Sequence, residues 1–389
     1  MKIKRCFFIV VVLYAFMVLP IFAKRFGAPK HLNGLNKHPV KSIKSPDGDI
    51  IECIHILHQP AFNNPLLKDH SIKMSPSYHP NGINSIKNGS SSSPPFAQLW
   101  HSNGKCPKGT IPIRRRTQKD DVFVRNHRKK SPFDPELDDD NHEYAHAYTE
   151  EGPFYGTQAT FSVWNPNVQL ADEFSLGQLW ITAANYETIE VGWQVYPGMY
   201  GDSTTRLFIF WTNDGYQNNQ CYNLDCPGFI QTNNEIVLGG SISPTSEVDG
   251  YQNDMTVLVW KNPKDGNWWL EVGGKILGYW PSSLYTRLSE SASMLDWGGE
   301  VVNDRIDGLH TTTQMGSGYF SEEGSGKASY IKNIQIVDEY NVFRSPGQLT
   351  TSVSRKDCYD LTMGNNDIYN WGTYLFFGGP GRNQYCVQG

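Results

Sequence analysis

The sequence predicts an all-β protein built as an antiparallel sandwich or barrel. Short strand-like runs alternate with turns from residue 157 onward, without the alternating strands and long helices that a parallel sheet needs. Gly and Pro are plentiful, at 36 and 23 residues, and 13% of the chain is aromatic. This composition is typical of β-rich folds.

The clearest strand pattern lies in ETIEVGWQVYPGMYG, Glu187–Gly201. Apolar side chains alternate with Thr, Glu, Gly and Gln as far as Val195, which predicts one apolar and one polar face. Glu190 lies on the polar face, and Gly192 follows it at a position where another backbone often comes close. We expect Glu190 on the floor of a groove that accepts an extended chain. A solvated Glu on an open sheet face is the simpler alternative.

Other strands and turns follow from the same patterns. Runs that are typical of strands are residues 159–164, 179–182, 207–212, 256–260, 268–272, 329–337 and 371–377. Asp214-Gly215 and Asp265-Gly266 are typical of hairpin turns. One short helix is expected over Ser283–Ala292.

The N-terminal segment indicates export. Residues 1–23 place three basic side chains before a short apolar run, with Ala23 at a candidate cleavage site, as in a secretory signal. No later stretch is long and apolar enough to cross a bilayer. We therefore expect a secreted, extracellular protein with no membrane partner. Asn88, in the Gly/Ser/Pro-rich linker 81–95, is a predicted glycosylation site.

Six of the seven cysteines follow the signal, an even number typical of a disulfide framework. Six cysteines can pair in many ways, and we predict the pairs by proximity. The predicted pairs are Cys53 with Cys106, Cys221 with Cys226, and Cys358 with Cys386. No Cys-x-x-Cys arrangement supports a zinc–thiolate site. Paired cysteines also leave no thiol for nucleophilic catalysis.

Charge divides the chain into two parts. Residues 24–130 hold 19 basic and 6 acidic side chains, a net charge of +13, whereas residues 131–389 hold 12 and 33, a net charge of −21. Export disfavours nucleic-acid binding, and docking of the basic part on the acidic part explains the asymmetry more simply. We place the segments at 24–130, a processing linker at 131–141, and the main domain at 142–389.

HEYAH, His142–His146, matches the H-E-x-x-H pattern of zinc proteases. That chemistry needs a helix, but Gly152-Pro153 follows closely and strand-like segments surround the motif. No G-x-x-H extension lies nearby. We expect the first strand of the main domain here and no metal or other cofactor; a zinc site is the alternative.

A second carboxylate, Glu300, lies in LDWGGEV. Its two preceding glycines would let a substrate backbone approach, and Trp297 would form an apolar wall. An exposed Glu at a β-bulge is the alternative. Two carboxylates in one pocket can hold one proton between them, which is what acid–base catalysis needs. Spacing alone does not show whether Glu190 and Glu300 meet.

Longer segments resemble one family. TIEVGWQVYPGMYGD, RLFIFWTNDGYQNNQCYNLDCPGFIQ and LDWGGEV resemble the neprosin family of plant secreted proteins. SPDGDIIECIHILHQPAFNNPLL and CPKGTIPIRR resemble the activation peptide that precedes the neprosin domain. The resemblance covers roughly residues 45–388, and the charged segment Arg125–Asn141 departs from it.

The resemblance implies an antiparallel β-sandwich behind a small activation-peptide domain. It also implies a glutamic endopeptidase that cuts after proline in acid, with Glu190 and Glu300 as the catalytic pair. One Glu would take a proton from water and the other would give one to the amide, with the roles open. Gln194 would help to hold the tetrahedral intermediate, and Tyr196 and Trp297 would pack on a proline ring.

The expected partners are proline-containing peptides or proteins and the chain's own propeptide, which would keep the precursor latent as an intramolecular inhibitor. Two alternatives stay open. A β-sandwich with two Glu residues also suits a glycoside hydrolase, and a cell-wall-binding protein would use the groove without catalysis. Serine catalysis is disfavoured because no G-x-S-x-G motif is present.

Overall fold

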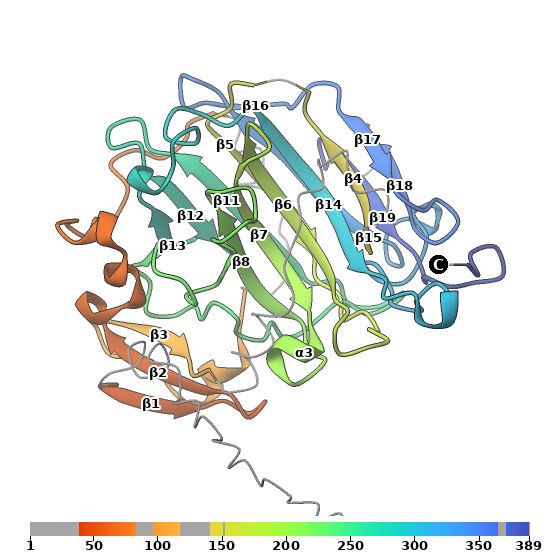
Figure 1. Cartoon of the computed structure of the whole chain (residues 1–389), viewed down its shortest axis with the longest axis horizontal. Coiled ribbons are helices and arrows are strands. Elements are labelled where there is room, and N and C mark those ends of the chain that lie inside the picture. The colour runs from red at the N-terminus through yellow and green to blue at the C-terminus, as the bar shows by residue number, and fades with distance from the viewer. Residues whose placement is uncertain (1–38, 83–95, 117–140, 151, 365–370, 389) are drawn as a thin grey trace, which may run out of the picture.

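Two large antiparallel β-sheets lie face to face, and a small three-stranded sheet packs at one end of them (Figure 1). This computed structural model describes residues 39–82, 96–116, 141–150, 152–364 and 371–388. The predicted all-β antiparallel architecture is confirmed, and it is a sandwich rather than a barrel. The described helices are short: η1 (Ile56–His58), η2 (Pro60–Asn63), η3 (Pro65–Leu67), η4 (Leu99–Asn103), α3 (Pro197–Tyr200), η5 (Ser282–Leu284), η6 (Ile306–Gly308) and η7 (Ser321–Glu323).

Several predictions concern residues outside the described part of the chain. These are the signal segment 1–23, the glycosylation site Asn88, and most of the processing linker 131–141. Within the described part, no helix is long and apolar enough to span a bilayer.

The seven-stranded sheet has the order β17-β4-β14-β6-β7-β8-β9. Its strands are β4 (His142–Tyr148), β6 (Ser175–Ala183), β7 (Glu187–Val195), β8 (Arg206–Thr212), β9 (Cys221–Tyr222), β14 (Met294–Val302) and β17 (Thr350–Val353). β7 has the bounds that the period-two pattern predicted. β6 lies between β7 and β14, the two strands that carry the glutamates. The backbones of β7 and β14 are therefore two interstrand spacings apart, or roughly 10 Å.

The nine-stranded sheet has the order β10-β13-β12-β11-β5-β15-β19-β18, with β16 beside β15. Its strands are β5 (Gly156–Ser162), β10 (Ile230–Gln231), β11 (Asp254–Lys261), β12 (Trp268–Val272), β13 (Lys275–Trp280), β15 (Ser329–Val337), β16 (Phe343–Arg344), β18 (Asp360–Gly364) and β19 (Tyr374–Gly378). The predicted turn at Asp265-Gly266 joins β11 to β12 as an antiparallel hairpin.

The main core lies between the two large sheets. Trp193 of β7 donates from Nε1 to the Ser162 carbonyl (2.9 Å), and Trp297 of β14 donates to Thr157 Oγ1 (3.2 Å). Both acceptors are on β5 of the opposite sheet, and both indoles are fully buried. Because side chains alternate along a strand, residues an odd number of positions from these tryptophans point away from this core.

The small N-terminal sheet contains β1 (Lys41–Lys44), β2 (Ile50–His55) and β3 (Thr110–Arg114) in that order. Its own small core includes the Cys53–Cys106 disulfide and Trp100, and it also takes in Val237 of the main domain. Figure 1 shows this sheet below the ends of β7 and β8, next to α3.

The helix predicted over Ser283–Ala292 is wrong. Only Ser282–Leu284 forms a 3₁₀ turn. The buried carboxylate of Glu187 accepts the backbone N–H groups of Thr286 (2.7 Å), Arg287 (2.8 Å) and Leu288 (2.8 Å). Three successive amides bound to one carboxylate are not available for helical hydrogen bonds.

The three disulfides predicted by proximity are confirmed. Cys53 pairs with Cys106, Cys221 with Cys226, and Cys358 with Cys386. The last two close loops with sequence separations of 5 and 28 residues. Under the chain-entropy view, the longer loop restricts the unfolded chain more.

We therefore expect removal of the Cys358–Cys386 bridge to destabilise the protein more than removal of Cys221–Cys226. The expected losses in unfolding free energy are about 3–4 and about 2 kcal/mol. Paired Cys→Ser variants, unfolded in guanidinium, measure both losses. The reverse order, or free thiols at these four positions in peptide mapping of the unaltered protein, would contradict the expectation.

Candidate active site

The centre of the outer face of the seven-stranded sheet is unusually flat. Gln178 of β6 lies directly opposite Gly192 of β7 on one side and Gly298 of β14 on the other. A Cβ atom at Gly192 would lie 2.0 Å from the Gly177 carbonyl oxygen, and one at Gly298 would lie 2.3 Å from the Ala145 carbonyl oxygen. Both glycines are therefore required by close backbone approach, and Gln178 has no side chain beside it on either neighbouring strand.

Glu300 lies on this face and is fully buried. Its Oε1 atom contacts His142 Nδ1 at 2.7 Å and accepts a longer hydrogen bond from Tyr144 Oη at 3.4 Å. Its Oε2 atom accepts from Gln178 Nε2 at 3.3 Å. The carboxylate thus has an imidazole, a phenol and an amide as partners.

Glu190 lies on the same face and is also fully buried. Its Oε1 atom accepts hydrogen bonds from Tyr216 Oη (2.7 Å) and Thr188 Oγ1 (3.1 Å). Trp180 and Phe210 lie directly opposite it on the neighbouring strands. Two of the hydrogen-bond partners of Glu190 are therefore hydroxyl groups, and its neighbours across the sheet are aromatic.

Both carboxylates contribute to the raised pKa values of two tyrosines. Burial raises the pKa of Tyr216 well above its ordinary value, and the charges of Glu190 and Glu300 add to the increase. Burial also raises the pKa of Tyr222, with Tyr196, Glu300 and Glu190 contributing. The two glutamates therefore contribute to the same electrostatic environment.

Three further residues were predicted to line the groove. Gln194 lies on the correct face, but its Nε2 atom donates to Tyr200 Oη at 2.8 Å rather than lying beside either glutamate. Tyr196 packs edge-on against Phe174 at 5.1 Å, in an aromatic cluster on the same side of the sheet. The prediction for Trp297 is wrong, because its indole lies between the sheets.

The HEYAH motif forms β4, as the surrounding pattern predicted. His142 and His146 contact different carboxylates, with His146 Nδ1 at 2.7 Å from Asp296 Oδ2. The helical geometry in which two such histidines share one metal ion is therefore not formed.

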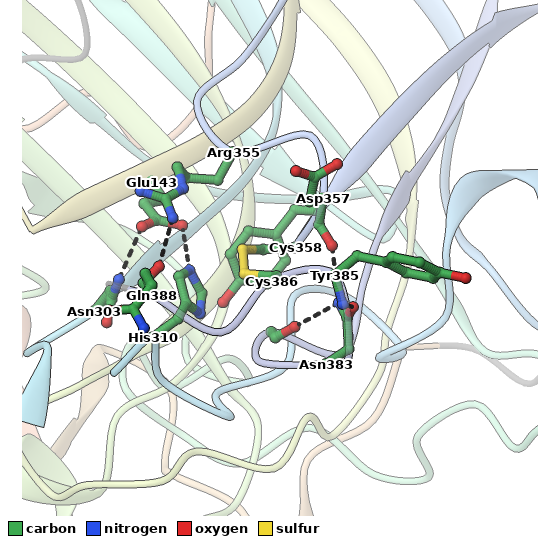
Figure 2. Close-up of a disulfide and its surroundings, with 12 residues drawn as sticks. Glu143, Asn303, His310, Arg355, Asp357, Cys358, Asn383, Tyr385, Cys386 and Gln388 are labelled. Atoms are coloured by element: carbon green, nitrogen blue, oxygen red, sulfur yellow. Dashed lines mark hydrogen bonds and ion pairs between the residues drawn. A yellow bond between two sulfur atoms is a disulfide. The ribbon is translucent and has the colours of Figure 1, made fainter. Parts of the chain in front are cut away.

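Glu143 points to the opposite face of β4 and has a structural role (Figure 2). It accepts a hydrogen bond from Asn303 Nδ2 (2.9 Å) and contacts His310 Nε2 (2.9 Å). The other ring nitrogen of His310 contacts the Thr311 carbonyl oxygen (2.8 Å). Both ring nitrogens of His310 therefore lie within hydrogen-bond distance of an oxygen acceptor, one of them on Glu143. The Cys358–Cys386 disulfide lies beside this pair, and its sulfurs are bonded to each other rather than available to a metal.

Sequence reasoning missed three residues of the site. His142 was seen only as a zinc candidate, and Gln178 belongs to no motif. Tyr216 follows a predicted turn and adopts a left-handed φ of 61°, which is rare for a bulky residue. Period-two alternation in SLGQLW and HEYAH was the available signal for the first two.

Two family profiles match the chain. The profile described as Neprosin matches residues 171–380, which include Glu190 and Glu300. The profile described as Neprosin activation peptide matches residues 42–148, which include all but the first residue of the small N-terminal sheet, and also β4.

Among solved structures, the chain is similar to scytalido-glutamic peptidase with a peptide-based transition-state analogue. The identity is 11%, the TM-score is 0.34, and the match covers 61% of this chain and 98% of that chain. It is also similar to SCP-B, a member of the eqolisin family of peptidases in complex with a tripeptide, with 10% identity, a TM-score of 0.32 and coverage of 60% and 96%. The apo Crh5 transglycosylase gives 13% identity, a TM-score of 0.24 and coverage of 39% and 49%. At these scores, the likenesses carry no weight for the activity of this chain.

The Glu143–His310 pair yields a test of the zinc alternative. Glu143→Gln should lower the free energy of unfolding by roughly 1–3 kcal/mol, because it weakens the buried contacts of Glu143 with Asn303 and His310. Catalytic turnover per folded molecule and the melting temperature in o-phenanthroline should stay unchanged. A stable but inactive Glu143→Gln variant, with chelator-sensitive activity restored by zinc, would show a metalloprotease.

Proposed function

The chain belongs to the neprosin family, and we propose that it is the precursor of a secreted acid glutamic endopeptidase that cuts after proline. The observation that carries the proposal is the placement of Glu190 and Glu300, both fully buried, on one face of one sheet around Gln178. Secretion is part of the proposal and rests on the signal-like residues 1–23.

The proposed reaction uses the two carboxyl groups in different protonation states. The ionised one takes a proton from water, and the water oxygen attacks the peptide carbonyl carbon. The protonated one gives its proton to the amide nitrogen as the C–N bond breaks, which releases an amine and a carboxylic acid. The proton that the base took from water then moves to the other carboxylate, which restores the starting protonation state of the pair.

Gln178 is better placed than Gln194 to stabilise the tetrahedral oxyanion. Its Nε2 atom already reaches Glu300, and the glycines opposite it on both neighbouring strands place no side chain beside it. The aromatic cluster on the same side offers flat surfaces on which a proline ring packs. The cluster is Phe174, Tyr196, Tyr200, Phe208, Phe210, Tyr216 and Tyr222, with the aliphatic neighbours Leu176, Met199 and Val302.

We expect Glu190→Gln and Glu300→Gln each to fold normally and to lose peptide hydrolysis by roughly 10²–10⁴-fold, because each removes one proton-transfer group. The double variant should be little worse than either single variant. Digestion of proline-containing peptides at acid pH, followed by mass spectrometry, measures the loss and the cleavage site.

Asp296→Asn is the matched control, because Asp296 is also a buried carboxyl group on the same face of β14. It should keep most of the activity. Near-wild-type turnover in either glutamate variant would remove the basis for the pair. Cleavage of polysaccharides but not peptides would indicate the carbohydrate-active alternative.

Latency is the second part of the proposal, and it rests on contacts between the small N-terminal sheet and the main domain. Arg206 of β8 is fully buried, and its Nη1 atom is 2.6 Å from Asp49 Oδ2 of the N-terminal part. Asp49 Oδ1 is held by Arg114 Nε at 2.9 Å, and the neighbouring Asp47 accepts a hydrogen bond from Ser241 Oγ. This carboxylate link, which we call the Asp47–Asp49 latch, joins the two parts.

The charges in the Asp47–Asp49 latch are opposite in sign to the net charges of the two parts that it joins. Residues 24–130 are net positive, yet within the described chain the most buried ion pair between the two parts has its carboxylate on that segment and its cation on the acidic domain. Arg116–Asp225 (3.3 Å) follows the expected polarity but is more exposed. Uncharged bonds add to the docking, such as Gln59 Oε1 with the Gln231 N–H (2.8 Å). Docking therefore depends on specific contacts more than on the overall charge.

The latch predicts the pH at which latency ends. Partial burial raises the pKa of Asp47, but hydrogen bonds from Ser241 and Ser45 outweigh burial, and the net pKa is lowered. A carboxyl group of this kind stabilises docking above its ordinary pKa, near ~4, and loses that contribution as the pH falls through the lowered value. Release is therefore expected below about pH 4.

Two histidines modify docking at milder pH. The hydrogen bond to Glu271 raises the pKa of His79, so this contact is complete below about pH 6.5 and is lost as the pH rises through the raised value. Burial lowers the pKa of His70, which contacts Tyr279 Oη at 2.8 Å, so protonation of His70 opposes docking. Because the two effects have opposite signs, mild acid alone should not release the N-terminal part.

We expect full-length protein to stay latent from pH 7 to about pH 5 and to activate as the pH falls below about 4. Asp49→Asn should raise the pH of half-activation, because a neutral amide holds Arg206 less strongly. Glu323→Gln removes an exposed carboxylate elsewhere and serves as the control. Activity and intact mass against pH measure both, with the new N-terminus expected between residues 125 and 145. Equal activity of intact protein at pH 7 would refute latency.

A further inference from the structure

Three aromatic side chains form a row on the outer face of the nine-stranded sheet. Trp260 of β11 lies directly opposite Trp269 of β12, and Trp269 lies directly opposite Tyr279 of β13. Val259 lies opposite Thr157, whose hydroxyl group faces the other sheet, so the next residue, Trp260, points away from the core between the sheets. All three aromatic residues are fully buried, and we call them the aromatic row.

A segment of the N-terminal part, residues 70–82, contacts both ends of the aromatic row as it runs past β13 towards β16 (Figure 1). Tyr279 Oη accepts a hydrogen bond from the backbone N–H of Lys73 at 3.0 Å. At the other end, Trp260 Nε1 donates to the backbone carbonyl oxygen of Tyr78 at 3.0 Å. The segment therefore covers the row in the precursor.

These bonds are made to the main chain of the segment, and the segment ends in the same way. The Asn81 N–H donates to the Asn341 carbonyl oxygen (3.0 Å), and the Asn81 carbonyl oxygen accepts from the Phe343 N–H (2.8 Å). Every peptide carries such backbone groups, so this surface can hold other extended chains through the same bonds. Recognition of amide groups favours a peptide over an oligosaccharide as the ligand.

The composition of the segment indicates which peptides fit. Pro80 is buried and Pro76 is half-buried. Because proline restricts the backbone before binding, an extended proline-containing chain loses little entropy on an aromatic surface. Residues 70–82 contain no Asp or Glu, and His79 Nε2 lies 3.2 Å from Glu271 Oε2 of β12. The surface therefore suits neutral or basic chains that contain proline.

The central residue of the row, Trp269, gives an independent indication of a ligand. Its Nε1 atom is buried and has no hydrogen-bond partner among the described residues, although the segment contacts the row on both sides of it. A buried donor without a partner costs free energy, which is recovered when an acceptor is placed against it. A peptide that directs a carbonyl oxygen to this atom gains a bond that residues 70–82 do not make.

We propose that the aromatic row is an exosite, a second binding site outside the catalytic groove, for extended proline-containing peptide chains. Residues 70–82 occupy it in the precursor. Each described disulfide lies within the N-terminal part or within the main domain, so none of the three holds the parts together after a cut in the linker. Release of the N-terminal part then uncovers the row. The inference rests on the proposed function for this release and adds a site that retains long substrates.

The first experiment measures binding after the N-terminal part has been released. Full-length protein is cut in the linker with trypsin, held below about pH 4 to separate the parts, and returned to about pH 6, where its melting transition checks the fold. A fluorescent peptide with the sequence of residues 70–82 should bind this product and should bind the uncut protein far more weakly. An N-terminal part that stays bound at every pH, or a main domain that unfolds on its release, overturns the inference.

Variants then locate the bound peptide. Trp260→Phe and Trp269→Phe keep an aromatic ring but remove an N–H donor, and each should weaken binding by roughly threefold to tenfold. Tyr330→Phe, which alters a buried aromatic residue of β15 in a separate cluster of the same sheet, is the matched control and should leave binding unchanged. A peptide with Pro76→Ala and Pro80→Ala should bind more weakly. Equal loss in the control, or binding of cello-oligosaccharides but not the peptide, overturns the inference.

The second experiment separates the exosite from the catalytic groove. Excess peptide 70–82 should inhibit hydrolysis of a long proline-containing protein but not of a short chromogenic peptide. Trp269→Phe should raise KM for the long substrate and leave kcat/KM for the short one unchanged. Equal inhibition of both substrates places the peptide in the catalytic groove and overturns the exosite. Peptide binding that responds to the row variants in a protein that hydrolyses no substrate supports the exosite and refutes the proposed peptidase.

Discussion

The arrangement of the site depends on the packing of the two large sheets against each other. Trp193 and Trp297 are fixed in the core by bonds to β5, and each lies three positions from one of the two glutamates. Alternation along the strands then directs Glu190 and Glu300 to the outer face together. A one-residue slip of either strand would bury one carboxylate in the apolar core, so the packing that stabilises the fold also determines the site.

Much of this follows from local sequence patterns. The predicted bounds of β7 and β15 match the structure to the residue, and proximity along the chain was enough to predict the three cysteine pairs. Trp297 shows where the reasoning failed: Trp297 and Glu300 are expected to line one groove, whereas β14 is a regular strand from Met294 to Val302. In a regular strand, residues 297 and 300 cannot share a face, so alternation itself contained the correction.

Features that depend on contacts distant in sequence could not be predicted. The pairing of His142 with Glu300 spans 158 positions, and Glu187 prevents a helix about 100 residues away. The orientation of the Asp47–Asp49 latch was equally hidden, because net charge averages over many exposed side chains. Exposed ion pairs contribute little because solvent screens them, whereas removing one partner of a buried ion pair is costly because the other charge is left buried. Bulk charge therefore suggested that the parts would dock but not which groups would hold them.

The glycines on either side of Gln178 change what the two Glu motifs mean when they are found in other chains. Gly192 and Gly298 permit an interstrand approach that no larger residue allows. In a relative that retains both glutamates but has alanine at either position, the added Cβ would force the neighbouring strands apart. The sheet that carries the two carboxyl groups would then be distorted. The presence of both glutamates alone is therefore not enough to predict that a relative is catalytically active. The complete Glu–x–Gly and Gly–x–Glu spacings therefore distinguish chains that can form this site from chains that have only the two glutamates.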